Sequence, residues 1–187
     1  MREGNKIVLQ DQSAKAPDKT YPITFRLPVT LVEELKRESA NSRVSLNTLV
    51  KQIFDKYILW ERHSNKLGLI PSTRPFLAET LKNLSDEQIK HIAYNGSKNA
   101  LKELVLLARG DLSLHSFVSV FNEWLKASWM AYRYEFDGKK HRYVIHHNLG
   151  IKWSLYLSDL LTAISVDLTC VNPHVVIRKE SISVEFP

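Results

Sequence analysis

The N-terminal third of the chain contains one strand pattern followed by two helical patterns. Residues 23–27 alternate apolar and polar side chains between two prolines, which is typical of a short strand. Two amphipathic stretches follow, separated by a turn at residues 41–43. Ser45 stands as an N-cap before the second of them, which continues to about Trp60. The pattern predicts strand-helix-helix over residues 21–62.

The rest of the chain has a different periodicity after a cluster of glycine and proline. Residues 85–88 have the form of a capping box, and further helical patterns follow them. Two alternating runs then flank Asp137, and a helical stretch lies between them and two short apolar runs at the C-terminus. The predicted fold class is therefore α+β, with the N-terminal strand-helix-helix unit followed by a mixed domain of helices and then β-β-α-β-β. The predicted organisation is a mobile tail at 1–20, the helical unit at 21–62, a linker at 63–75 and the mixed domain at 76–187.

Two local features give sharper predictions. The dipeptide Asp137-Gly138 favours a two-residue hairpin turn, which would place Glu135 opposite Lys140 as a cross-strand charge pair. The segment at residues 95–97 contains asparagine, glycine and serine, and it is expected to interrupt a helix.

Composition narrows the classes of function. The 187-residue chain has 26 basic and 20 acidic residues, a formal charge of +6, which suits a polyanionic partner without requiring one. Its single cysteine excludes an internal disulfide framework and favours a reducing compartment, hence a cytoplasmic location. No stretch approaches the ~20 apolar residues of a membrane span. No glycine-rich phosphate loop or nucleophile elbow is present, so we predict that the protein is not an enzyme and has no catalytic residues.

Several potential metal ligands lie in the C-terminal part. On one strand, His141 and His147 would point along the same face about 20 Å apart while His146 would point to the other face, because side chains alternate and rise about 3.3 Å per residue. Cys170 and His174 follow further along the chain. This spacing argues against a common ion, and we predict no metal site and no cofactor.

The N-terminal pattern resembles the Arc/MetJ-type ribbon-helix-helix family of DNA-binding proteins. The resemblance rests on residues 23–28, especially Arg26-Leu27-Pro28, on the helical pair Leu31 and Leu35, and on residues 44–47 leading into the second helix. The turn at residues 41–43 contains no glycine, which the family often has there. The resemblance covers less than a quarter of the chain and implies a homodimer whose paired strands enter the major groove of DNA.

The resemblance also implies roles for individual residues. Thr24 and Arg26 would face the bases, since arginine can bind guanine acceptors and threonine can contact a base edge or a thymine methyl group. The start of the second helix at Ser45 would bind a DNA phosphate through the free backbone N–H groups of Leu46 and Asn47. The dimer core would contain the apolar residues Ile23, Phe25, Leu27, Leu31, Leu35, Val50 and Phe54.

The functional expectation is a sequence-specific transcriptional regulator that binds a palindromic site in double-stranded DNA as a homodimer or higher oligomer. Its C-terminal domain would sense a small molecule, add oligomeric contacts or bind a partner protein. The alternatives are an antitoxin-like protein and a protein-interaction module whose C-terminal domain binds another protein.

Overall fold

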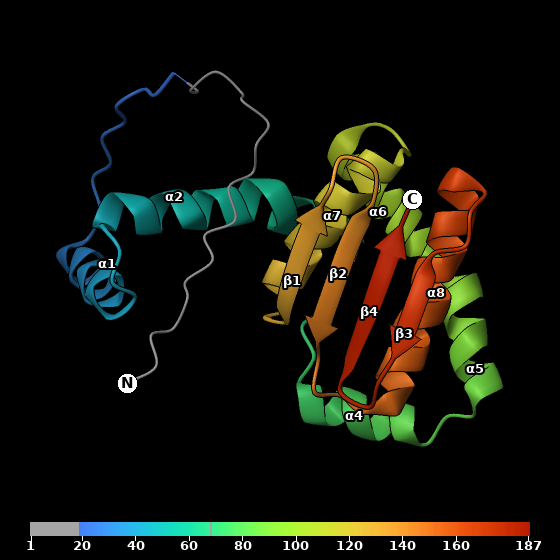
Figure 1. Cartoon of the computed structure of the whole chain (residues 1–187). Helices are drawn as coiled ribbons and strands as arrows, with labels where there is room; N and C mark the ends of the chain where they lie inside the picture. The colour runs from blue at the N-terminus through green and yellow to red at the C-terminus, as the bar shows by residue number, and fades with distance from the viewer. Residues whose placement is uncertain (1–18, 68) are drawn as a thin grey trace, which may run out of the picture. The chain divides into compact units, whose positions relative to one another are not determined.

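The computed structural model describes residues 19–67 and 69–187 (Figure 1). Its contacts divide the chain into two compact units, Met1–Leu46 and Asn47–Pro187. The first unit contains a segment without regular secondary structure followed by a helix, and the second contains nearly all other elements. In chain order the elements are α1 (Val29–Asn41), α2 (Leu46–Lys56), the π-helical turn η1 (Tyr57–Glu61), α3 (Arg62–Ser64), the 3₁₀ turn η2 (Asn65–Leu67), α4 (Arg74–Lys82), α5 (Asp86–His91), the π-helical turn η3 (Ile92–Ser97), α6 (Lys98–Arg109), α7 (Leu114–Ala127), β1 (Ala131–Phe136), β2 (His141–His146), α8 (Ile151–Thr169), β3 (His174–Ile177) and β4 (Ser181–Phe186).

The predicted ribbon-helix-helix fold class is wrong. Residues 19–28, which include the alternating run at 23–27, form no strand, and within the described chain the strands lie between Ala131 and Phe186. The alternation of side chains is present in the sequence, but a strand also needs a neighbouring backbone with which to exchange hydrogen bonds. Helices α1 and α2 do occupy the stretches in which helices were expected.

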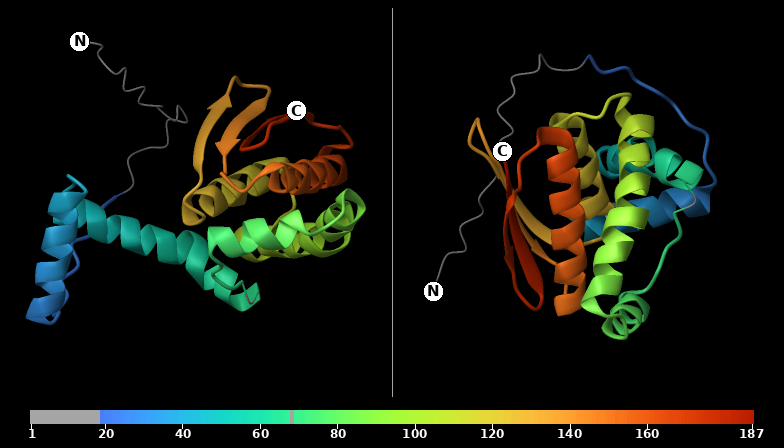
Figure 2. Two further views of the ribbon diagram at one scale, coloured as in Figure 1. Left: turned by 90° about the horizontal axis from the view of Figure 1, so that it is seen from below. Right: turned by 90° about the vertical axis from the view of Figure 1, so that its right-hand side faces the viewer.

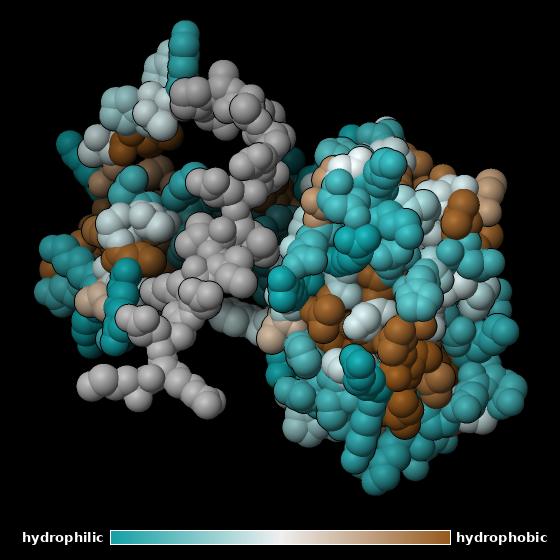
Figure 3. Space-filling model, in the orientation of Figure 1, coloured by the Kyte–Doolittle hydropathy of each residue, from teal (hydrophilic) through white to brown (hydrophobic). Residues whose placement is uncertain are grey.

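The second unit is a four-stranded antiparallel sheet covered on one face by helices. The strand order is β1-β2-β4-β3. Helices α7 and α8 lie against the sheet, and α5 and α6 form a further layer behind them (Figure 2). The opposite face of the sheet is open and carries both polar and apolar side chains (Figure 3). From β1 to β4 the elements follow the order β-β-α-β-β that the periodicity indicated.

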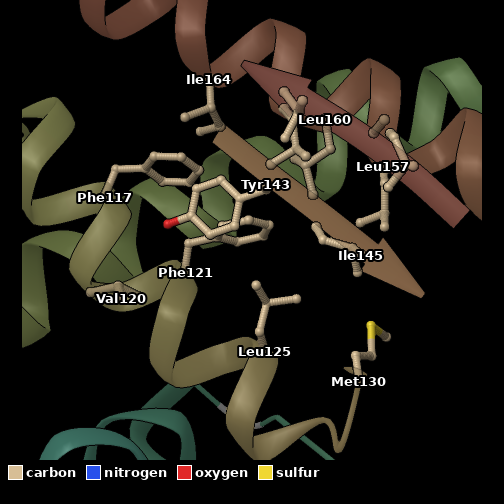
Figure 4. Close-up of a cluster of buried hydrophobic side chains, with 14 of the residues drawn as sticks. Phe117, Val120, Phe121, Leu125, Met130, Tyr143, Ile145, Leu157, Leu160 and Ile164 are labelled. Atoms are coloured by element: carbon tan, nitrogen blue, oxygen red, sulfur yellow. The ribbon is translucent and has the colours of Figure 1, made fainter. Parts of the chain in front are cut away.

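The core of this unit lies between the sheet and its first helical layer. Aromatic side chains of α7 meet Tyr143 of β2, and aliphatic side chains of α8 close the cluster from the other side (Figure 4). The ring of Phe121 contacts that of Tyr143 edge-on, with 5.2 Å between centroids. Ser113 caps the N-terminus of α7, accepting a hydrogen bond from the Ser116 N–H at 3.1 Å, and so fixes where this helix begins.

The helix at residues 86–109 continues through the segment at which an interruption was predicted. The capping box between Ser85 and Gln88 opens it, and Gly110 ends it in the left-handed conformation. Residues 95–97 are accommodated in the wider turn η3 rather than in a break. A second π-helical turn, η1, likewise joins α2 to α3. Helical hydrogen bonding continues through both places, because a π-helical turn accommodates an extra residue without ending the helix.

The hairpin register also differs from the prediction. Phe136 pairs with His141, so Glu135 lies opposite Arg142 and not opposite Lys140. The loop therefore holds four residues, and the Asp137 side chain accepts hydrogen bonds from the Lys139 and Lys140 N–H groups at 3.0 and 2.9 Å. This side-chain turn at aspartate takes the place of the tighter two-residue turn.

The predicted linker at 63–75 begins in a helical region. Turn η1 packs on α7, and α3 packs on α6. His63 and Ser64 are consequently buried. Residues without regular structure are found at 69–73, before α4.

Candidate functional site

The two residues predicted to read bases lie in the segment without regular secondary structure. Thr24 and Arg26 are both exposed to solvent. The structure does not place them on a strand. The alternation of side-chain direction along a strand, which was expected to direct both residues to the bases, is therefore absent. Both side chains remain accessible to a polyanionic partner.

Of the three residues predicted at a phosphate, Leu46 and Asn47 begin α2 and Ser45 directly precedes it. Ser45 and Asn47 are exposed and Leu46 is partly exposed. Helix α2 has eleven residues, and the start of a helix favours anions.

Sequence reasoning missed Arg43. Its φ angle is +54°, and its N–H donates to the Ala40 carbonyl at 3.1 Å while the Val44 N–H donates to the Ser39 carbonyl at 3.0 Å. These bonds close α1 in a Schellman motif, in which glycine usually occupies the left-handed position. The sequence signal that could have identified Arg43 is the absence of glycine from the turn at residues 41–43. An arginine at this position presents an exposed cation shortly before α2.

The residues of the predicted dimer core are not buried in the single chain. Ile23 and Phe25 are 71% and 53% exposed, and Phe54 is 47% exposed. No residue of α2 is buried, although its apolar side chains recur at a spacing of three and four residues. The other members of the set, Leu27, Leu31, Leu35 and Val50, are exposed or partly exposed.

A groove of about 310 Å³ lies between the α2–η1 helix and the C-terminal end of α7. Its apolar lining includes Leu59, Trp60 and Trp129. Charged side chains that line the groove form ion pairs within the chain. One of them is Lys126, whose Nζ is 2.9 Å from a carboxylate oxygen of Glu123. The groove is therefore an apolar surface bordered by ion pairs.

Trp129 has an unusual backbone at the end of α7. Its φ angle is +53°, its N–H donates to the Lys126 carbonyl at 3.1 Å, and the Met130 N–H donates to the Leu125 carbonyl at 3.3 Å. A bulky residue thus fills the glycine position of a second Schellman motif. The guanidinium of Arg74 donates to the Trp129 carbonyl at 2.6 Å, while the residue is 82% exposed. Local stability does not explain a tryptophan here.

Replacing Trp129 by glycine is expected to raise the free energy of unfolding by about 0.5–1 kcal/mol, since glycine adopts positive φ without steric cost and little of the ring is buried. Urea denaturation checks this. Ser128→Gly is the matched control, because Ser128 has an ordinary helical φ of −82° and glycine should destabilise there. A Trp129→Gly protein less stable than the parent would mean that the ring supports the fold.

The histidines occupy separate environments. His141 lies between aromatic rings, with its Nδ1 2.7 Å from the Tyr134 hydroxyl and its ring 4.4 Å from that of Phe136. Burial lowers the pKa of His141. His146 and His174 are exposed, as is Cys170, which follows α8. Within residues 19–67 and 69–187, no group of three or more histidine, cysteine, aspartate or glutamate side chains is arranged to hold a metal ion.

His147 and Ser154 form a buried pair that resembles a nucleophilic dyad only in composition. The His147 Nε2 is 2.7 Å from the Ser154 Oγ, while the Leu149 N–H donates to the His147 Nδ1 at 3.1 Å. The proton of His147 is therefore on Nε2, and Ser154 donates its own hydroxyl proton to the Arg178 carbonyl at 2.6 Å. A histidine that donates to the serine cannot act as its base. The pair joins β2, α8 and the loop before β4.

Across the described residues, no single helix is long and apolar enough to cross a membrane; one pair, Asp86–Arg109 with Leu114–Ala127, meets the criteria only together and is bent by 99°.

Comparison of the chain with protein-family models, with curated proteins and with solved structures finds no match.

Proposed function

We propose that this protein is a cytoplasmic regulator of transcription that binds double-stranded DNA as a homodimer. The observation that carries the proposal is α2, which has a largely exposed apolar stripe along one side and an exposed polar residue, Asn47, in its first turn. Apolar stripes of this kind are normally covered by another helix or another chain. A second copy would cover the stripe and bring two sets of DNA-binding residues together.

The DNA contacts in this proposal do not involve a β-ribbon. Arg26 and Thr24 would reach DNA from an extended segment, and the start of α2 would meet a phosphate. Arg43 adds a cation just before that helix. The overall charge of +6 favours association with a polyanion. Interactions of this kind supply affinity mainly through phosphates, and sequence preference would come from Thr24 and Arg26.

A salt titration of DNA binding tests the proposal. For the full-length protein, the logarithm of the binding constant should fall linearly with the logarithm of salt concentration. Arg43→Ala is expected to weaken binding to all sequences and to reduce the slope by about 1 for each phosphate that the variant no longer neutralises. Arg26→Ala should cost about 1–3 kcal/mol at a selected site and relax base preference.

Arg178→Ala is the matched control, because Arg178 is an exposed arginine in the sheet domain and has no role in the proposed DNA interface. It should leave the slope unchanged. DNA binding that is insensitive to both Arg26→Ala and Arg43→Ala would refute the proposed interface.

A protein-interaction module is the second candidate, and Trp129 favours it. Exposed tryptophans beside apolar grooves are frequent centres of protein interfaces. The same titration separates the two candidates, because an interaction module without a DNA site gives no salt-dependent binding at any sequence.

A further inference from the structure

His63 is a buried histidine with one ring nitrogen that has no hydrogen-bond partner. It lies in α3, which packs on α6, and only 6% of its surface is exposed. The Arg62 Nε–H donates to its Nε2 at 3.0 Å. Because an arginine can only donate, Nε2 carries a lone pair and the proton of the neutral imidazole is on Nδ1. Nδ1 has almost no exposed surface and makes no hydrogen bond to any residue that the structure describes.

This buried N–H group is unfavourable as it stands. A donor that leaves water without gaining an acceptor loses its hydrogen bond and gains nothing in return. Such groups are rare in folded proteins, and a bound ion or molecule is one of the few physical reasons for them. An acceptor from outside the chain would therefore be stabilising at the Nδ1 of His63.

Three cations surround the imidazole. Arg62 contacts it directly, and Lys66 follows three residues later, in η2. Arg109 approaches from the C-terminal end of α6, the helix on which α3 packs. Burial lowers the pKa of His63, and the charges of Arg62, Lys66 and Arg109 lower it further. The imidazole is therefore neutral at pH 7, while the charge around it is positive.

The chain does not neutralise these cations. Among residues 19–67 and 69–187, Arg62, Lys66 and Arg109 have no ion-pair partner. Glu61, which directly precedes Arg62, pairs with Lys56 at 3.0 Å. Arg109 donates through Nε to the Ser119 hydroxyl and through Nη1 to the Ala108 carbonyl, and its Nη2 makes no hydrogen bond within the described chain. Positive charge and unused donors thus meet at one place.

We propose that the junction of α3 and α6 binds the terminal phosphate group of a small molecule. The His63 Nδ1–H would donate to one phosphate oxygen, and Arg62, Lys66 and Arg109 would balance the charge. Phosphate suits this set of groups because it combines several acceptor oxygens with up to two negative charges.

The burial of Nδ1 restricts the ligand. The nitrogen is reached only when side chains at α3 move, so the group that enters has to be small. A terminal phosphate or inorganic phosphate meets this condition. A phosphate in the backbone of DNA carries a sugar on two sides and does not.

This site goes beyond the proposed function. It lies on the second compact unit and shares no residue with the proposed DNA contacts. It assigns a chemical class to the small molecule that the domain following the DNA-binding unit was expected to sense. Phosphate binding is measured without DNA, so the two proposals fail independently.

A titration of the full-length protein with inorganic phosphate, at pH 7 and constant ionic strength, tests the site. An NMR spectrum that correlates the ring nitrogens and protons should show the proton of His63 on Nδ1, and phosphate should shift this signal to saturation. Lys66→Ala is expected to weaken phosphate binding about three- to tenfold, because it removes one of the charges that hold the anion. Lys179→Ala removes the same charge at an exposed lysine between β3 and β4, and it should bind phosphate like the parent.

A second variant tests the buried donor. His63→Phe keeps a flat ring and removes the N–H group. Urea denaturation in phosphate and in chloride of equal ionic strength measures the stabilisation by bound phosphate. Phosphate also stabilises proteins in general, by exclusion from their surface, so the result depends on the comparison between variants. The gain in phosphate should be smaller for His63→Phe than for the parent, and that of Lys179→Ala should equal the parent's.

Four results would overturn the proposal. They are a His63 proton on Nε2, a ring signal that phosphate does not shift, a Lys66→Ala protein that binds phosphate like Lys179→Ala, and a His63→Phe protein with the full gain in phosphate. A lower salt dependence of DNA binding in Lys66→Ala would place DNA at this site and would contradict a small-molecule ligand.

Discussion

Replacing Phe117 by alanine should lower the free energy of unfolding by about 3–5 kcal/mol, the usual cost of truncating a fully buried phenylalanine. The side chain has no exposed surface. Its ring stacks on Phe121 at 5.5 Å and meets Phe186 edge-on at 5.7 Å, so it links α7 to the last strand. The alanine variant would leave a cavity in the layer that attaches the helices to the sheet. Urea denaturation followed by circular dichroism measures the change.

Phe136→Ala is the matched control for this truncation. Phe136 is a phenylalanine of the same domain but is 54% exposed, so its truncation should cost much less than that of Phe117. Equal costs at the two positions would show that the core is not centred between α7 and β4.

Phe25 is 53% exposed, and its truncation is expected to affect self-association more than the stability of the single chain.

Acid should destabilise the fold through His147. Burial lowers the pKa of this side chain, with Glu180 raising it to a smaller extent and His146 lowering it. Its Nδ1 already accepts the Leu149 N–H, so a second proton would set a donor against a donor. Below the ordinary histidine pKa of about 6.5, the unfolded chain takes up a proton that the folded chain refuses. The stability that this group contributes is therefore complete above that pH and is lost as the pH falls through the folded pKa.

The size of the effect follows from linkage. Each refused proton changes the free energy of unfolding by about 1.4 kcal/mol per pH unit between the two pKa values. Burial lowers the pKa of His63 and of His141 as well, so the three groups act in the same direction. Denaturant unfolding at pH 8, 7, 6 and 5 measures the slope.

His147→Gln keeps a donor near Ser154 and removes the titrating ring. We expect lower stability than the parent at pH 8 and a flatter pH dependence below pH 6.5. The same substitution at His174, which is exposed and is not among the groups that shift the pKa of His147, is the control and should leave the parent slope in place. A His147→Gln slope equal to that of the parent would show that His147 is not the proton-linked group.

Local sequence signals determined where one helix begins and the succession of strands and helix along the C-terminal part of the chain. The capping box at Ser85 acts within one turn of the chain, so the sequence by itself predicted it. The alternating runs around Asp137 and near the C-terminus likewise predicted the four strands and the intervening helix. These features depend on interactions between residues close in sequence.

Only the tertiary structure decided features that depend on distant partners. Residues 23–27 have a strand pattern but no strand, because a strand requires a neighbouring backbone that the sequence pattern cannot supply. The burial of His147 depends on Ser154 and the loop before β4, and the exposure of Trp129 depends on how α7 ends. The place of β1 at one end of the strand order became visible only in the structure, since a six-residue alternating run is the same in the middle of a sheet and at its border.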